Sequence, residues 1–399
     1  MQLVEQHVIP QTDQRFATID RAAFAAKNLY NAALYLVRQS FIFEKVYLNY
    51  YDVNARMKDT AEYQALPRKV SQQVLKLLHH NWQGFFGAMK AYQADPSKFL
   101  GRPKLPKYLD KQNGRFILVY TLQAISVPAL KRGMIVPSGL AIEVQTRQTD
   151  IAQVRIIPRG SFYVVEVVYE KDVERAAVDP QLRAAIDIGL NNLAAITSDK
   201  VGFVPVLVNG RPLKHINQFY NKRIAHLQAK LGRAGRTALM KRLTERRNRQ
   251  IAHYLHTHSR RIIEMLVAEG IGTLVIGKNP EWKQAIELGK RTNQSFVQIP
   301  HARFIEMLTY KAELVGIRVV LVNESHTSKC SFLDGEPVCH HERYLGKRTT
   351  RGLFRASNGR RINADVNGSL NILRKAIPDS FGQGIAAVVG QPVGKAPTY

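Results

Sequence analysis

Residues 183–198, which read RAAIDIGLNNLAAITS, carry the main signal for the fold class. A short apolar run, residues 184–186, ends at one acid, Asp187. A second apolar run begins after Asn191 and Asn192. The alternation and the β-branched content predict a strand that turns into its hairpin partner. An ionised carboxylate in such a run is unfavourable unless it is paired, hydrogen-bonded or bound to a metal. Asp187 is therefore either a turn or capping residue or a member of a functional site.

A second acid of this kind lies far downstream, in residues 362–373, which read INADVNGSLNIL. Val366, Leu370 and Leu373 follow Asp365 at helical spacing, so Asp365 is expected where a helix begins. An ordinary N-cap is the simpler explanation of this residue taken alone. Two carboxylates brought together from distant parts of a chain, however, can hold two divalent ions about 4 Å apart. The pair predicts a metal centre that cuts nucleic acid.

Composition indicates a nucleic acid as the partner. The net charge is +27 over 399 residues, and the basic residues are spread along the chain. Such a surplus is typical of polyanion binding and favours a long phosphate path. An anionic membrane is the competing partner, but the sequence has no apolar run of a membrane helix's length and no signal peptide. Two cysteines, Cys330 and Cys339, are too few for a disulfide framework, which fits a reducing cytoplasm.

The whole chain predicts an α/β protein of several domains. Strand-like, helical and again strand-like patterns follow one another along the first 169 residues, which predicts a small β-barrel or sandwich with a helical insertion. The expected division is a β-barrel at 1–15 plus 113–178, a helical insertion at 16–112, an α/β domain at 179–330 plus 363–378, an insert at 331–362, and a flexible tail at 379–399.

Within the α/β domain, a strand at 272–276, a helix at 304–315 and a strand at 317–322 predict a right-handed parallel unit. Both strands then end at one edge of the sheet, where open α/β sheets place their ligands. The second strand is followed closely by Glu324. A basic helical hairpin at about 214–269 precedes this unit, and its arginine-rich face suits a duplex backbone.

Basic side chains that are expected to contact phosphates occur in the helical insertion, the proline-rich loop at 98–107, the basic hairpin and the insert. They are Lys27, Arg38, Arg102, Lys104, Lys107, Lys222, Arg223, Arg242, Arg246, Arg249, Arg355 and Arg361. A solvated charged face is the alternative for each of them. The hairpin favours binding because its charges are nearly all of one sign.

Six short stretches make the chain resemble the TnpB family of transposon-encoded, RNA-guided DNA nucleases, which are related to the type V CRISPR effectors. They are residues 29–33 (LYNAA), 99–103 (FLGRP), 187–192 (DIGLNN), 311–316 (KAELVG), 324–329 (ESHTSK) and 363–368 (NADVNG). Each stretch is weak alone, but the set in this order and at this spacing is specific and covers nearly the whole chain.

The resemblance implies a wedge β-barrel with a helical insertion, followed by a RuvC-like nuclease domain of the RNase H fold. Asp187 is then the first RuvC acid and Asp365 the third. The implied cofactor is Mg²⁺, bound as two ions, and the implied partners are a guide RNA and a double-stranded DNA target. A location in the prokaryotic cytoplasm, at the nucleoid, follows from the same resemblance.

The family's second acid is missing from its usual place. It normally follows the strand at 272–276, where this chain has Gly277 and two polar residues. Glu281 and Glu287 lie further along, in a segment that looks like a loop. Glu324 is the better candidate, because adjacent strands are only about 4.8 Å apart and it follows the neighbouring strand.

Three functions remain open from the sequence. The main one is a Mg²⁺-dependent, RNA-guided DNA endonuclease in which Asp187, Glu324 and Asp365 are the catalytic and metal-binding residues. The second is a nuclease-dead, guided DNA-binding protein or repressor, which the missing acid at Gly277 favours and the retained aspartates oppose. The third is a DNA-strand-transfer transposase, since a RuvC-like core can support that chemistry.

The insert departs from the family in a second way. Relatives carry two Cys-x-x-Cys pairs, where this chain has Ser331 and Asp334 at the first pair and Arg355 and Asn358 at the second. The cysteines and histidines nearby lack a usual zinc-ligand spacing. We therefore expect no structural zinc and an insert, related to a zinc ribbon, that keeps its shape by other contacts.

Overall fold

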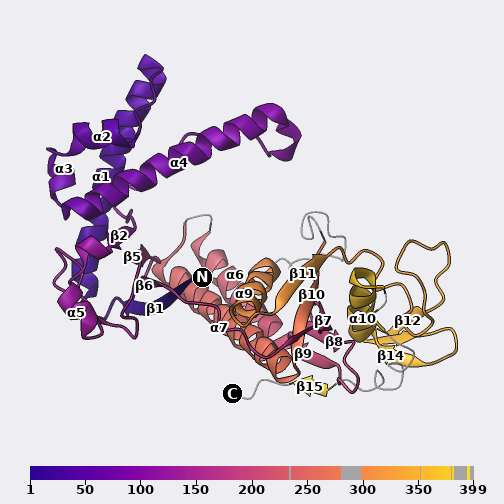
Figure 1. The fold of residues 1–399 in the computed structure, drawn as a ribbon. Helices are drawn as coiled ribbons and strands as arrows, with labels where there is room; N and C mark the ends of the chain where they lie inside the picture. Colours follow the sequence, from indigo (N-terminus) through magenta and orange to yellow (C-terminus); the bar gives the residue numbers. More distant parts are fainter. Residues whose placement is uncertain (233–234, 280–297, 351, 379, 382–392, 396–399) are drawn as a thin grey trace. The chain divides into compact units, whose positions relative to one another are not determined.

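The computed structural model describes residues 1–232, 235–279, 298–350, 352–378, 380–381 and 393–395, which form a mixed α/β structure (Figure 1). It divides into two compact units, Met1–Lys171 and Asp172–Tyr399, so the expectation of several domains is confirmed at this coarse level. None of the helices in the described ranges is long and apolar enough to cross a membrane.

The first unit begins with one strand and then becomes helical. Its first half comprises β1 (Gln2–Pro10), α1 (Phe16–Gln39), η1 (Ser40–Glu44), α2 (Tyr50–Met57), α3 (Ala61–Gln64), α4 (Arg68–Ala94) and η2 (Pro96–Lys98). The second half comprises β2 (Leu118–Thr121), η3 (Leu122–Ala124), α5 (Val127–Lys131), β3 (Met134–Ile135), β4 (Val144–Gln145), β5 (Gln153–Pro158) and β6 (Phe162–Glu170).

The main sheet of this unit is antiparallel, in the order β1-β6-β5-β2. Strand β1 pairs with β6 along its whole length, from Gln2 opposite Glu170 to Pro10 opposite Phe162. The helices therefore lie between two strands of one sheet, as the insertion pattern predicted. The prediction of a closed barrel is wrong, because β1 and β2 are edge strands and the sheet is open. Strand β2 is only four residues long and runs directly into η3, which leaves no strand to join the edges.

The helices and this sheet share one hydrophobic core. Leu29 of α1, Trp82 of α4, Tyr120 of β2 and Val165 of β6 are all buried in the same cluster. The sequence directs this packing by placing apolar residues of α1 and α4 at helical spacing on one face. The helical region is thus built onto the sheet and has no separate core.

The second unit contains the α/β domain. Its elements are β7 (Asp179–Asp187), β8 (Asn192–Ser198), β9 (Val206–Asn209), α6 (Arg211–Leu231), α7 (Ala238–Ala268), β10 (Ile271–Gly277), α9 (His301–Leu314), β11 (Arg318–Val322), β12 (Lys347–Thr350), β13 (Leu353–Arg355), β14 (Arg361–Asn363), α10 (Ala364–Ala376) and β15 (Val393–Lys395).

The large sheet has the order β11-β10-β7-β8-β9-β15. Strands β7, β8 and β9 form an antiparallel meander, which confirms the hairpin predicted from residues 183–198. Strand β10 runs parallel to both β7 and β11, which confirms the predicted strand–helix–strand unit. Strands β12, β13 and β14 form a separate antiparallel sheet in the insert.

Helices cover both faces of the large sheet (Figure 1). On one face, Ala184 and Leu274 pack in a cluster with Leu255 of α7 and Phe304 of α9. On the other face, a cluster joins alternate strand residues to α10 and consists of Ala185, Val275, Ile372 and Leu373. Because successive strand residues point to opposite faces, this near-continuous apolar pattern places the sheet in the middle of three layers.

The expected flexible tail at 379–399 lies mostly outside the described residues. Three of its residues, Val393–Lys395, form β15 and pair in parallel with Val206–Val208 of β9. The free edge of β9 offers unpaired backbone groups, and such an edge accepts an added strand. At these three positions the segment expected to be flexible forms a regular strand.

Candidate metal centre

The three predicted acids come from three separate segments of the second unit, and Glu324 lies just after β11. Asp187 is the last residue of β7, opposite Ala195 of β8. Asp365 lies in the first turn of α10, where the helix was expected to begin. The N-cap of that helix is Asn363, whose side chain accepts hydrogen bonds from the backbone of Asp365 and Val366 at 2.9 and 3.2 Å. The carboxylate of Asp365 is therefore not needed as the cap.

Buried polar side chains fix α10 against the strands that carry the other acids. Ser369 donates a hydrogen bond to the carbonyl of Ala185 in β7, at 2.9 Å. Asn371 donates from Nδ2 to the carbonyls of Thr327 and Cys330 at 2.9 and 2.7 Å, in the segment that follows β11. Both side chains are fully buried. Removing either partner would leave a buried polar group unpaired, so these bonds are strong constraints on the geometry of the site.

Glu324 occupies the space beside Gly277. In the parallel pairing of β10 and β11, Gly277 lies opposite Val322, two residues before Glu324. A Cβ atom added at Gly277 would lie 2.9 Å from Oε2 of Glu324 and 2.6 Å from Cδ1 of Ile372. Asn279 braces the glutamate, donating from Nδ2 to Oε1 at 3.2 Å and accepting from its backbone N–H at 3.1 Å. The carboxylate of Glu324 therefore fills a volume that a side chain at position 277 would otherwise enter.

The carboxylates influence one another electrostatically. Burial, and then the negative charges of Glu324 and Asp365, raise the pKa of Asp187 well above its usual range, while Arg348 acts in the opposite direction. Burial raises the pKa of Glu324 to about 7. A site that raises carboxyl pKa values by burial and by like charge is typical of functional centres, because a cation can reverse both effects.

Asp365 is engaged by two neighbours. Its Oδ2 accepts a hydrogen bond from Nδ2 of Asn192 at 2.8 Å, and its Oδ1 lies 3.1 Å from Nη2 of Arg348. Asn192 belongs to the pair of asparagines that follows Asp187, and its position in that motif is the sequence signal for this role. Arg348 comes from β12 of the insert, and nothing in its local sequence distinguishes it from neighbouring basic residues.

The residues present fit a hard divalent cation. All candidate ligands are carboxylates, which are the oxygen donors that Mg²⁺ prefers. Oε2 of Glu324 is buried and has no hydrogen-bond partner among the described residues, so this oxygen is available to a cation. The site is not preassembled, however, since no group of three or more Asp, Glu, His or Cys side chains in the described ranges could hold a metal ion as it stands. Mutual repulsion and the contact with Arg348 both oppose such an assembly.

Comparison with known proteins gives the site its context. A family described as "Probable transposase" matches residues 166–283, and one described as "Cas12f1-like, TNB domain" matches residues 301–372. A TnpB-like protein, ORF457, of Acidianus two-tailed virus is 26% identical over 206 residues, covering 49% of this chain and 42% of that protein. The endodeoxyribonuclease Cas12f2 of a Micrarchaeota archaeon (strain CG1_02_47_40) is 28% identical over 230 residues, covering 54% of this chain and 40% of that protein. The chain is similar to TnpB-like and Cas12f proteins in these regions.

This chain spans about two fifths of the length of these two relatives. Among solved structures, a Cas12f1–sgRNA–target DNA complex is similar with a TM-score of 0.39 and 16% identity, covering 93% of this chain and 98% of that one. The mini-RNA-guided endonuclease CRISPR-Cas_phi3 has a TM-score of 0.42 and 10% identity, covering 99% of this chain and 94% of that one.

The insert is held together at the positions that align with the cysteine pairs of the TnpB family. Asp334, at the first pair, accepts hydrogen bonds from the backbone N–H and the hydroxyl of Ser357 at 2.9 and 2.6 Å, and Ser357 lies between the two positions of the second pair. Buried Glu336 accepts from the backbone of Ser331 at 2.6 Å and of Leu345 at 2.9 Å. These bonds connect the same parts of the insert that a metal would join. Asp334 is thereby occupied away from the carboxylates of the centre.

The side chains that are predicted to contact nucleic acid differ in their exposure. Lys27 is only 2% exposed, its ammonium donates to the carbonyl of Lys111 at 2.7 Å, and it lies 3.8 Å from the ring centroid of Phe24. The prediction that Lys27 contacts phosphate is therefore wrong, because its aliphatic stem faces the core of the first unit. Arg38 is half-buried and donates to the carbonyl of Pro106 at 3.3 Å. The others are exposed: Arg102, Lys104, Lys107, Lys222, Arg223, Arg242, Arg246, Arg249, Arg355 and Arg361.

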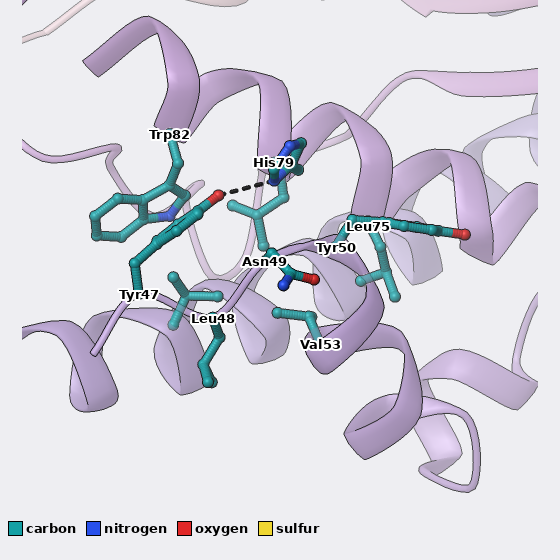
Figure 2. Close-up of a pocket in the computed structure, with 10 residues that line it drawn as sticks. Tyr47, Leu48, Asn49, Tyr50, Val53, Leu75, His79 and Trp82 are labelled. Atoms are coloured by element: carbon teal, nitrogen blue, oxygen red, sulfur yellow. Dashed lines mark hydrogen bonds between the residues drawn. The ribbon is translucent and has the colours of Figure 1, made fainter. Parts of the chain in front are cut away.

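A small pocket lies in the helical part of the first unit, lined by residues of α1, α2, α4 and the segment between η1 and α2 (Figure 2). Tyr47 and His79 share a hydrogen bond of 2.8 Å beside the ring of Trp82. Burial lowers the pKa of His79, so the imidazole stays neutral near pH 7. Most of the lining is apolar or aromatic, and the pocket is a packing feature of the helical core.

Proposed function

We propose that this protein is an RNA-guided DNA endonuclease with a RuvC-like site formed by Asp187, Glu324 and Asp365. The observation that carries the proposal is the complementarity of Gly277 and Glu324. The acid that follows β11 fills the volume beside the position where the family keeps its second acid. A protein that had merely lost the acid would have no reason to keep a buried, unpaired carboxylate oxygen at that place.

The proposed division of labour follows from the contacts of each acid. Asp187 ends β7 and Glu324 follows β11, the two strands that flank β10, and both would hold the cation from the strand side. Asp365 would complete the site from the first turn of α10, with Asn192 fixing the direction of its second oxygen. Bound Mg²⁺ ions would supply the positive charge that stabilises the attacking and leaving oxygens of phosphodiester hydrolysis.

We assign the open sheet and helices of the first unit to wedge-like and recognition functions, and the basic hairpin of α6 and α7 to the backbone of the nucleic acid. Base pairing with the guide would read the target sequence, while the protein would read backbone shape and a short flanking motif. The missing acid at Gly277 supports a second candidate, a guided DNA-binding protein without nuclease activity.

The proposal predicts cleavage that depends on both the guide and the metal. RNA that copurifies with the protein would be sequenced, resynthesised and bound to the purified chain, and DNA duplexes with and without a matching target would then be added. We expect the matched duplex to be cut in Mg²⁺ and left intact in EDTA. Tight, matched binding without any cutting would instead establish the guided binder, and RNA-independent strand joining would establish a transposase.

The basic hairpin predicts a salt-dependent loss of affinity on charge removal. Arg242 and Arg246 are exposed, four residues apart and on one face of α7. Replacing both with Ala should weaken RNA binding and reduce the slope of log affinity against log salt by about 1 to 2, since each phosphate contact releases counterions. Filter binding at several KCl concentrations measures this slope. An unchanged slope would place the hairpin outside the nucleic-acid path.

A further inference from the structure

A positively charged side chain lies inside the proposed carboxylate site. Nη2 of Arg348 is 3.1 Å from Oδ1 of Asp365, and the side chains are 42% and 25% exposed respectively. The two residues belong to different substructures, since Arg348 is on β12 of the insert and Asp365 is on α10. The positive charge of the same guanidinium also acts to lower the pKa of Asp187, so Arg348 influences a second acid of the site.

The strand register of the insert directs Arg348 toward this site. Arg348 pairs with Phe354 of β13, and directly opposite residues of an antiparallel pair share one face. Phe354 is buried in a cluster with Ile362 and Val366, and the latter belongs to α10. The neighbouring Lys347 pairs with exposed Arg355 and therefore lies on the other face. The position of Arg348 at the carboxylates thus follows from the packing of β12.

This contact competes with metal binding. Oδ1 of Asp365 cannot donate fully to a divalent cation while it accepts a hydrogen bond from a guanidinium, and the positive charge of Arg348 repels a second cation nearby. Without a counter-ion, three carboxylates in one half-buried site would repel one another. The arginine relieves that repulsion in the metal-free protein.

We propose that Arg348 is a built-in counter-ion of the metal centre, which holds Asp365 until a divalent cation displaces it. This inference rests on the proposed function, because it assumes that Asp365 is a metal ligand. Displacement also releases one of the contacts between β12 and α10, so occupancy of the metal site is coupled to the attachment of the insert.

The test is a Mn²⁺ titration of the metal-free, full-length protein without RNA or DNA, followed by the electron paramagnetic resonance signal of the unbound ion. Arg348→Ala should tighten Mn²⁺ binding by about fivefold, the scale of a partly exposed ion pair. Lys347→Ala is the matched control, because it removes the same charge from the adjacent position on the opposite face. It should leave the affinity within about twofold, the small effect of a screened surface charge.

A double-mutant cycle separates the local pair from a general charge effect. In an Asp365→Ala background, removing Arg348 should tighten the remaining Mn²⁺ binding by no more than about twofold, the effect of its charge alone. If Arg348→Ala binds Mn²⁺ with the same or lower affinity than the natural chain, the counter-ion role is overturned while the metal centre stands. If the natural chain binds no Mn²⁺, or binds it equally well without Asp365, the proposed metal centre fails and the inference fails with it.

Discussion

Glu324→Gln is expected to abolish DNA cleavage and, in the same protein freed of divalent ions, to increase stability at alkaline pH. The loss of cutting should be about 10³-fold or more, equivalent to about 4 kcal/mol of transition-state stabilisation, and should match that of Asp187→Asn. Gln has nearly the same shape as Glu, so the space beside Gly277 stays filled. The variant therefore tests the charge of the ligand and leaves the packing intact.

The stability effect follows from the pKa of Glu324, which burial raises to about 7. Between the ordinary value of 4.5 and this folded value, the folded state binds more protons than the unfolded state, so the free energy of unfolding falls as pH rises. The stability is fully present below about pH 4.5 and is lost as pH rises through about 7. Gln carries no charge at any of these pH values and avoids the loss.

Urea unfolding in EDTA at pH 5 and pH 8 measures this difference. We expect the two proteins to be nearly equal at pH 5 and Glu324→Gln to be more stable by about 2 kcal/mol at pH 8, with allowance for partial solvent exposure. Glu342→Gln, at an exposed position of the insert, is the control and should change neither stability nor cutting. Cutting that survives Glu324→Gln would rule out this acid and return attention to Glu281, which lies outside the described residues.

Two glycine-to-alanine substitutions are expected to impair the same site by steric displacement. At Gly277 the new Cβ would lie 2.9 Å from Oε2 of Glu324, and at Gly368 it would lie 2.7 Å from Oδ2 of Asp187. Each contact is too short to persist, so the carboxylate must move. A displacement of about 1 Å in a catalytic group can lower the rate by about 10²-fold, and we expect a loss of this size for each variant.

The Gly368 variant gives the sharper comparison. Ala in a helix interior is ordinarily more stable than Gly by about 1 kcal/mol, so α10 itself gains helix propensity while the site is disturbed. Gly87→Ala in α4 is the matched control, because nothing lies within 4 Å of its added Cβ. Gly368→Ala should therefore lower the cleavage rate at saturating Mg²⁺ without lowering the thermal unfolding temperature. Gly87→Ala should leave the cleavage rate unchanged. A wild-type rate in Gly277→Ala would mean that Glu324 is not held against β10 in the active protein.

Much of the α/β domain could be predicted from its own periodicity. The alternation in residues 183–198 specified the β7–β8 hairpin, and the sequence GTLVI at 272–276 specified a strand buried on both faces. The start of α10 was predictable because Asp365 precedes apolar residues at helical spacing. These are local patterns, and local patterns fix elements and their neighbours.

Features that depend on tertiary contacts could not be predicted in this way. The burial of Lys27 depends on the carbonyl of Lys111, 84 positions away, and nothing in the sequence of α1 marks that lysine as different from a surface one. The first sheet is open because its edge strands, β1 and β2, do not pair with each other, and this pairing is a tertiary contact. The positions of Arg348 and Asn192 at Asp365 depend on the packing of two distant segments against α10. Glu324 was within reach of prediction only because the parallel register of β10 and β11 follows from simple topology.

The shared volume of Gly277 and Glu324 has a consequence for how such a site can change over evolution. A side chain at 277 and a glutamate at 324 exclude each other sterically. A chain carrying acids at both positions would therefore have a distorted site. A chain carrying neither has lost a metal ligand. A change from one arrangement to the other needs two substitutions, one at position 277 and one at position 324. Either substitution alone is harmful, and it becomes beneficial only after the other has occurred. Related chains should consequently fall into two groups. One has an acid at position 277 and a small residue at position 324, and the other has glycine at 277 and an acid at 324; other combinations should be rare.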